Sequence, residues 1–151
     1  SLVRKALNTE NRDLRAPVAA LDGQGLGEAL LAPTRIYVKP MLQLMAQVNV
    51  KGVSHITGGG FYENIPRSLP GGMGAFVDRK ALRTPPLFHL IAREGDIPTE
   101  EMFSTFNMGV GMSVIVAAPE ADRALHLLQQ AGEAAYIMGE VRQSDTPLTL
   151  C

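Results

Sequence analysis

The sequence has little cysteine, no excess of charge of either sign and no long apolar run free of polar residues. Only one of its 151 residues is a cysteine, Cys151, so no intramolecular disulfide can form and a secreted disulfide-bonded scaffold is excluded. We therefore expect a reducing, cytoplasmic environment. The 14 Lys and Arg nearly balance the 15 Asp and Glu, which removes the usual electrostatic reason to expect nucleic acid or a membrane surface as partner.

No segment is typical of a membrane helix or a signal peptide. Residues 102–119 carry no charge, and their length would nominally span a bilayer. However, this stretch contains polar and helix-weakening residues, such as Asn107, Gly109 and Gly111, that do not suit a transmembrane helix. Arg4 and Lys5 are not followed by an apolar segment, as a signal peptide would require. We expect a soluble protein.

The chain alternates helical and strand patterns over the length of a single domain. Residues 1–8 have the spacing of a helix interior, which suggests a fragment of something longer. Helices are predicted at 25–32, 41–48, 61–69, 87–93, 99–107 and 119–131, and strands at 34–39, 50–57, 75–78, 112–118 and 134–141. Thr99 is the expected N-cap of its helix, and Met41, Met45, Met102, Met108 and Met112 are expected to fill the core.

The last third gives the clearest pattern, a strand–helix–strand unit over residues 112–141. A β-branched run is followed by Pro119 at a helix start and by Gly132 at the helix end, positions that these residues favour. The fold class is therefore α/β or α+β, with helices packed on a sheet.

The first candidate site is the run from Val53 to Arg67, V-S-H-I-T-G-G-G-F-Y-E-N-I-P-R. A strand leading into three glycines and a helix start puts backbone N–H groups where they can surround an anion. The run matches neither G-x-G-x-x-G nor the P-loop. Thr57, Asn64 and Arg67 could add a hydroxyl, an amide and a cation. Phosphate or substrate binding and a plain flexible turn are both compatible with this spacing.

Two further segments and one histidine have both a functional and a structural interpretation. Residues 105–112, T-F-N-M-G-V-G-M, join a helix to a strand through two glycines, with Asn107 as a candidate left-handed residue at the helix end. Arg35 and Lys39 lie on the predicted strand of P-T-R-I-Y-V-K, where they could contact phosphate or remain solvated edge charges. His55, directly before the glycines, could exchange a proton or be structural.

Together these segments resemble the C-terminal domain of the aminoimidazole ribonucleotide synthetase family, the phosphoribosylformylglycinamidine cyclo-ligases of purine biosynthesis. The resemblance rests on P-T-R-I-Y-V-K, H-I-T-G-G-G-F-x-E-N-x-P-R, T-F-N-M-G-x-G-M and a closing strand ending in G-E-V, in that order from residue 1 to about 141. It implies a three-layer α/β/α sandwich with a mixed sheet, partly ferredoxin-like. It also implies that residues 1–151 are the single C-terminal domain of a two-domain enzyme.

The resemblance further implies an activity that depends on the other domain. The family uses ATP and Mg²⁺, held by the N-terminal domain, to close formylglycinamidine ribonucleotide to 5-aminoimidazole ribonucleotide, and the enzyme is a homodimer. Residues 22–25, D-G-Q-G, resemble the start of the family's ATP motif, but Leu26 and Gly27 stand where Thr-Lys is needed, so we predict a turn. We expect this chain alone to be inactive and to bind no cofactor tightly.

Within this chain, the resemblance implies catalytic roles for His55 and Asn107 and no metal ligand. The substrate- and phosphate-binding residues that it implies are Thr57, Gly58, Gly59, Gly60, Asn64, Arg67, Arg35, Gly109 and Gly111. The alternatives are a stand-alone phosphate- or nucleotide-binding module, a domain of a related ATP-dependent enzyme of the selenophosphate synthetase or thiamine-monophosphate kinase type, and a structural half whose glycines only make turns.

Overall fold

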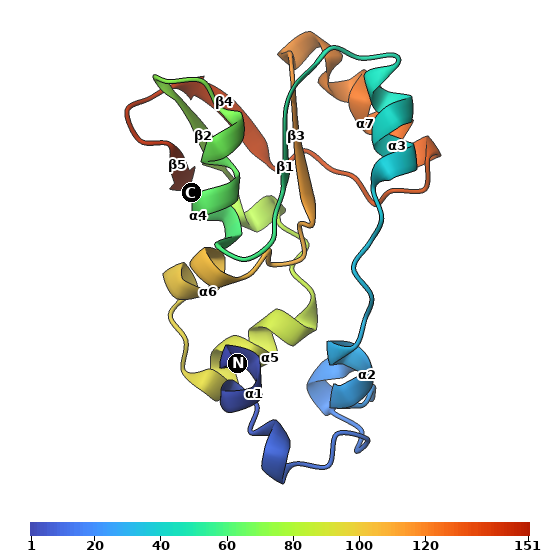
Figure 1. Cartoon of the computed structure of the whole chain (residues 1–151), viewed down its shortest axis with the longest axis vertical. Helices are drawn as coiled ribbons and strands as arrows, with labels where there is room; N and C mark the ends of the chain where they lie inside the picture. The colour runs from blue at the N-terminus through green and yellow to red at the C-terminus, as the bar shows by residue number, and fades with distance from the viewer.

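The computed structural model describes residues 1–151, with two small sheets in the upper half of the view and several helices below them (Figure 1). The α-helices are α1 (Leu2–Ala6), α2 (Leu26–Leu30), α3 (Val38–Met45), α4 (Gly60–Asn64), α5 (Pro86–Gly95), α6 (Thr99–Thr105) and α7 (Ala121–Gln130). The strands are β1 (Val50–His55), β2 (Met73–Val77), β3 (Met112–Val116), β4 (Gly139–Gln143) and β5 (Leu148–Leu150). Short 3₁₀ turns lie at Thr9–Asn11, Ala19–Leu21, Pro66–Ser68, Arg79–Ala81 and Ala118–Glu120. The α+β class is confirmed, and no helix has the length and apolarity needed to cross a membrane.

The five strands divide between an antiparallel pair and a mixed sheet. β1 pairs with β3, with Ser54 opposite Ser113 and His55 opposite Met112. β2 is the central strand of the other sheet, antiparallel to β4 and parallel to β5. A mixed sheet is thus present, as expected. In the predicted strand–helix–strand unit, however, β3 and β4 belong to different sheets, so they do not pair with each other.

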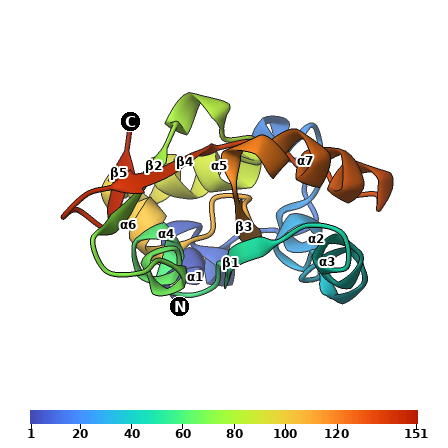
Figure 2. The same ribbon diagram turned by 90° about the horizontal axis from the view of Figure 1, so that it is seen from above.

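Helices α3 and α7 cover one face of the β1–β3 pair, at the end of the molecule away from the mixed sheet (Figure 2). Met41 and Leu44 of α3 are buried with Ala124 of α7. Because successive residues of a strand point to opposite faces, Val53 and His55 share the face of β1 that these helices cover. His55, at the end of the strand, is exposed. The layer formed by α3, α7 and the β1–β3 pair therefore ends at His55, a candidate site residue.

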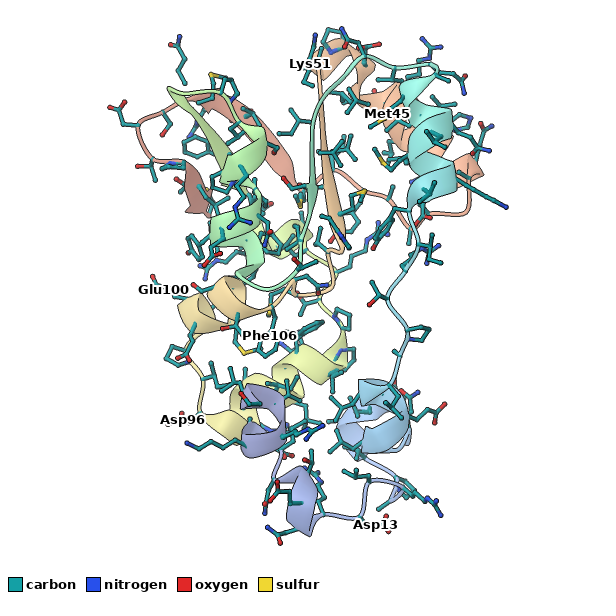
Figure 3. The ribbon with its side chains drawn as sticks, viewed as in Figure 1. Asp13, Met45, Lys51, Asp96, Glu100 and Phe106 are labelled. Carbon is teal, nitrogen blue, oxygen red and sulfur yellow. The ribbon has the colours of Figure 1, made fainter.

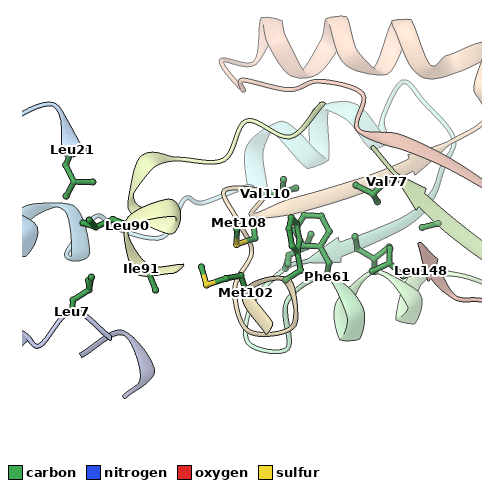
Figure 4. Close-up of a cluster of buried hydrophobic side chains, with 14 of the residues drawn as sticks. Leu7, Leu21, Phe61, Val77, Leu90, Ile91, Met102, Met108, Val110 and Leu148 are labelled. Carbon is green, nitrogen blue, oxygen red and sulfur yellow. The ribbon is translucent and has the colours of Figure 1, made fainter. Parts of the chain in front are cut away.

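A second cluster of 15 buried residues forms the main core. Figure 4 shows it as one elongated row, from Leu21 and Leu90 beside the N-terminal helices through Met102 to Phe61 and Leu148 at the mixed sheet. Phe61 is fully buried, and its ring meets the ring of Phe103 edge-on at a centroid distance of 5.1 Å. The residue that directly follows the three glycines is thus anchored in the centre of the core.

Two sequence predictions about local structure are wrong near prolines. Residues 34–39 do not form a strand: residues 33–37 are an irregular connection, and α3 starts at Val38 and includes Pro40. Proline is tolerated there because the first N–H groups of a helix have no partner inside the helix. In α6 the N-cap is Pro98, because Thr99 already lies in the helix and makes no side-chain cap.

Other sequence predictions, on strand bounds, methionine burial and a turn, are confirmed only in part. The strand predicted at 134–141 starts only at Gly139, and β5 was not predicted. Met45 is 50% exposed rather than part of the core, whereas Met41, Met102 and Met108 are buried as expected. The turn predicted at residues 22–25 is present, with Asp22 and Gly23 both at positive φ.

Candidate functional site

The three motif segments meet where β1 ends and β3 begins. Because the two strands are antiparallel, the last residue of β1, His55, lies opposite the first residue of β3, Met112. The pairing extends beyond the strands, since the N–H of Ile56 donates to the carbonyl of Gly111 at 2.9 Å. The glycine loop, which we define as residues 57–60, therefore starts beside the loop of residues 106–111.

Tyr37 brings the third segment to the same place. Its ring meets the His55 imidazole edge-on, at a centroid distance of 6.0 Å and an interplanar angle of 73°. Its hydroxyl occupies the place that a side chain at position 111 would need. Position 111 therefore requires glycine, because any side chain there would collide with the Tyr37 hydroxyl. This role of Gly111 is steric. The sequence interpretation did not include Tyr37 in the site, although it lies within P-T-R-I-Y-V-K.

The glycine loop depends on two residues in the left-handed region. Gly59 has φ +89° and Gly60 has φ +54°, conformations that residues with a Cβ adopt only at a cost. A Cβ on Gly60 would also meet the backbone carbonyls of Phe103 and Phe106. The loop is therefore pressed against the end of α6, and Gly60 is buried while Thr57 and Gly58 are exposed.

Asn64 holds the glycine loop from inside. Its side chain is 7% exposed, and its Nδ2 donates to the carbonyls of Gly58 at 3.2 Å and Gly60 at 2.7 Å. The hydroxyl of Ser54 in turn donates to the backbone carbonyl of Asn64 at 3.0 Å. With its N–H groups used in this way, the Asn64 amide is part of the scaffold of the loop rather than a free donor for a ligand.

Asn107 shapes the neighbouring loop by a side-chain hydrogen bond. Its Oδ1 accepts from the N–H of Gly109 at 3.0 Å, and its carbonyl accepts from the N–H of Val110 at 2.8 Å. The left-handed residues are Met108, at φ +49°, and Gly109, at φ +93°, so the expectation that Asn107 itself is left-handed is wrong. The hydrogen bond from the N–H of Gly109 to the Asn107 side chain forms an Asx turn, which mimics a backbone turn.

The two candidate phosphate-binding arginines are both in ion pairs. Arg35 Nε lies 2.7 Å from Glu133 Oε2, and its guanidinium also donates to the carbonyl of Gly132 at 2.9 Å. Arg67 pairs with Glu63 at 3.2 Å, one helical turn away, and both side chains are largely exposed. An exposed pair of this kind contributes little to stability, about 0.3–0.5 kcal/mol, so Arg67 can turn to an anion more readily than Arg35.

The environment of Tyr37 alters its acidity. The pKa of its hydroxyl is raised above the ordinary value of 10.0, first because burial disfavours the phenolate and second because the Glu133 carboxylate repels it. The nearby Arg35 guanidinium opposes this shift. At neutral pH Tyr37 is therefore a neutral hydroxyl group that can donate a hydrogen bond beside His55.

Alkaline pH is expected to destabilise the chain through Tyr37. Because its pKa is higher in the folded than in the unfolded chain, its contribution to stability is complete below pH ~10 and is lost as the pH rises through the raised value. In Tyr37→Phe this loss disappears, so the free energy of unfolding should fall less steeply with pH. Urea unfolding of both proteins at a series of alkaline pH values measures the slopes, and parallel slopes would contradict the expectation.

The comparisons with known proteins agree with the motifs. A family model described as "AIR synthase related protein, C-terminal domain" matches residues 1–147. The chain is 51% identical over 129 residues to a protein of Alkaliphilus metalliredigens, covering 85% of this chain and 37% of that protein. It is 47% identical over 152 residues to one of Lachnoclostridium phytofermentans, covering 100% and 44%. Both carry the name phosphoribosylformylglycinamidine cyclo-ligase, and the chain spans about two fifths of their length.

Proposed function

The chain belongs to the family of AIR synthase related proteins through their C-terminal domain, and on this premise we propose that it is the C-terminal domain of a phosphoribosylformylglycinamidine cyclo-ligase. Residues 1–151 form one domain of this enzyme, and a preceding domain completes it. The proposal is supported by the family match over nearly the whole chain and by relatives that carry this name and are more than twice as long.

The reaction proposed is the ATP-dependent ring closure of formylglycinamidine ribonucleotide to 5-aminoimidazole ribonucleotide, with ADP and phosphate as the other products. An amide oxygen is a poor leaving group, and phosphoryl transfer from ATP makes it a good one. The amidine nitrogen of the same substrate then attacks that carbon, and phosphate departs. Such a reaction relies on positioning and on stabilisation of charge around the phosphoryl group.

The observation that carries the proposal for this half of the enzyme is the convergence of the three motif segments. Tyr37, His55 and Gly111 come from the three segments and lie together at the end of the β1–β3 pair. Beside them the exposed part of the glycine loop presents backbone without a side chain at Gly58. This arrangement suits the approach of a phosphorylated substrate.

We assign roles to the exposed side chains of this region. His55 and Thr57 donate hydrogen bonds or handle a proton, and Arg67 supplies positive charge to a phosphate. Asn107, Gly109 and Gly111 shape the second loop beside the substrate. Asn64 keeps the glycine loop in place, and Arg35 is held at the end of α7 by Glu133. Arg35 therefore contributes to the site only if that ion pair opens.

This chain has no site in which protein side chains alone would hold a metal ion. Nowhere do three or more His, Cys, Asp or Glu side chains gather in a way that could hold a metal. We propose that ATP and Mg²⁺ bind to the preceding domain, as the family resemblance implies. The same domain is the proposed site of homodimer formation.

Alanine at His55 or Asn107 should lower turnover of the two-domain enzyme by at least ~10-fold, about 1.4 kcal/mol of transition-state stabilisation. The measurement is steady-state formation of aminoimidazole ribonucleotide, with urea unfolding as a control for stability. His89→Ala is a matched control, because His89 is an exposed histidine on α5, outside the three motif segments. Near-normal turnover with normal stability would remove the residue from the site.

The substrate assay also distinguishes the alternatives. An enzyme of the selenophosphate synthetase or thiamine-monophosphate kinase type would consume ATP with selenide or thiamine monophosphate and not with formylglycinamidine ribonucleotide. A stand-alone binding module would bind the ribonucleotide in calorimetric titration of the 151-residue chain, and the two-domain protein would show no turnover. Lack of turnover by the two-domain protein with formylglycinamidine ribonucleotide would contradict the proposal.

A further inference from the structure

Helix α3 has two apolar faces, and the chain covers only one of them. Met41 and Leu44 are 8% and 0% exposed, where α3 packs with α7 on the β1–β3 pair. Val38, Leu42 and Met45 lie on a second face, at spacings of four and three residues, and are 61%, 63% and 50% exposed. At 3.6 residues per turn the two faces are about 100° apart. A surface helix with one neighbour needs a single apolar stripe.

Two further exposed apolar residues lie in the segment before α3. Ile36 is 80% exposed and Leu31 is 83% exposed. Figure 1 shows this connection running along the outer edge of the molecule from α2 to α3, and Met45 marks the other end of α3 in Figure 3. Five of the seven exposed large hydrophobic residues of the chain thus fall within residues 31–45. We name Leu31, Ile36, Val38, Leu42 and Met45 the apolar strip.

The charges around the apolar strip limit what can cover it. Residues 31–45 contain no Asp or Glu, and their two cations are Arg35 and Lys39. Arg35 is already paired with Glu133, whereas Lys39 is exposed and forms no ion pair. A complementary surface is therefore apolar at its centre and acidic where it meets Lys39.

We propose that the apolar strip is the docking surface for the preceding domain of the same polypeptide, which rests on the two-domain enzyme proposed above. The chain spans only 37–44% of the length of its relatives, so in them more than half of the protein lies outside this domain. Interfaces between domains of one chain are small, about 600–1,500 Å². Covalent linkage raises the effective concentration of the two surfaces, so a strip of five side chains suffices.

A separate second copy of the chain is a less favourable occupant, because it has no covalent linkage to raise its effective concentration. Association of separate molecules costs several kcal/mol of lost translational and rotational freedom, roughly 4–15 kcal/mol. Stable interfaces accordingly use about 20–30 residues on each side. The apolar strip contains five, and no other large apolar side chain between residues 31 and 45 is exposed to extend it.

The apolar strip borders the candidate site through Tyr37. Ile36 and Val38 are exposed, while the residue between them points inward, to His55 and Gly111. A body docked on the strip would therefore lie directly behind Tyr37 and fix the segment that carries it. The preceding domain, which we propose to hold ATP, would in this way contact the segment that brings Tyr37 to the candidate site.

Thiol labelling tests the proposal. Leu42→Cys is made in a Cys151→Ser background, both in the 151-residue chain and in the two-domain protein, and the rate of maleimide labelling is read by peptide mass spectrometry. Gln43→Cys is the matched control, because Gln43 is exposed on the polar side of the same helix. We expect residue 42 to label at least ~10-fold more slowly in the two-domain protein, since a covered thiol is inaccessible to the reagent. Residue 43 should label equally fast in both.

Two results would overturn the proposal. Equal labelling of residue 42 in the two proteins would leave the apolar strip uncovered. Slower labelling at higher concentrations of the 151-residue chain, with a dimer in sedimentation velocity, would assign the strip to a second copy. The labelling needs no turnover, so it reads the docking surface independently of the cyclo-ligase assay, in which the unmodified two-domain protein tests the proposed function.

Discussion

Replacing Phe61 with alanine is expected to lower the free energy of unfolding by about 3–5 kcal/mol. The side chain is fully buried, and its ring packs edge-on against Phe103, so truncation removes apolar burial, leaves a cavity and breaks an aromatic pair. Urea unfolding followed by circular dichroism measures the loss. Because a domain of this size has only about 5–15 kcal/mol of stability, Phe61→Leu is measured in parallel, with a smaller loss expected.

The neighbouring aromatic residue gives the matched control. Tyr62 is on the same helix and is 37% exposed, so Tyr62→Ala should cost no more than about 1 kcal/mol. Equal losses for Phe61→Ala and Tyr62→Ala would contradict the placement of Phe61 at the centre of the core. Since Phe61 directly follows the glycine loop, its loss should also speed amide hydrogen exchange in that loop.

Gly60→Ala should destabilise the chain by about 2–5 kcal/mol, through left-handed strain together with overpacking. Gly60 has φ +54°, and an added Cβ would meet the backbone carbonyls of Phe103 and Phe106. These carbonyls are backbone and cannot change rotamer as a flexible side chain can. Either the glycine loop or the end of α6 must therefore move. Urea unfolding measures the cost, and turnover of the two-domain enzyme should fall with it.

Gly58→Ala is the control for this prediction. Gly58 has no positive φ, and a Cβ there would meet nothing within 4 Å. Its substitution should change stability by less than about 0.5 kcal/mol. If Gly58→Ala leaves stability unchanged but weakens binding of the ribonucleotide, then open backbone at this position serves the ligand. Equal destabilisation by the two alanines would contradict the described loop geometry.

Much of the local structure could be predicted because its causes lie within a few residues. Apolar periodicity indicated α5 and α7, and a β-branched run indicated β3, all of which the structure contains. The same approach failed at residues 34–39. There Ile36 and Tyr37 favour a strand by composition, but α3 starts two residues before Pro40 and packs on α7. Propensity is a weak preference that tertiary packing overrides.

The candidate site was predictable as motifs but not as geometry. Three of the candidate glycines, Gly59, Gly60 and Gly109, have positive φ, whereas Asn107, which was expected to be left-handed, does not. Their partners were not predictable. Arg35 bonds to Gly132, 97 residues away, and Tyr37 meets His55 across the end of a strand. The side chain of Asn64, predicted as a ligand contact, donates to the carbonyls of Gly58 and Gly60, which the sequence did not indicate.

The sequence by itself determined the α+β class, the family and the places where the chain must turn. Only the tertiary structure decided that β3 and β4 belong to different sheets, that Tyr37 joins the candidate site, and that α3 keeps a second apolar face exposed. The physical reason is the range of the interactions. Turns and helices follow from neighbours along the chain, whereas strand pairing, burial and ion pairs depend on residues that meet only after the chain has folded.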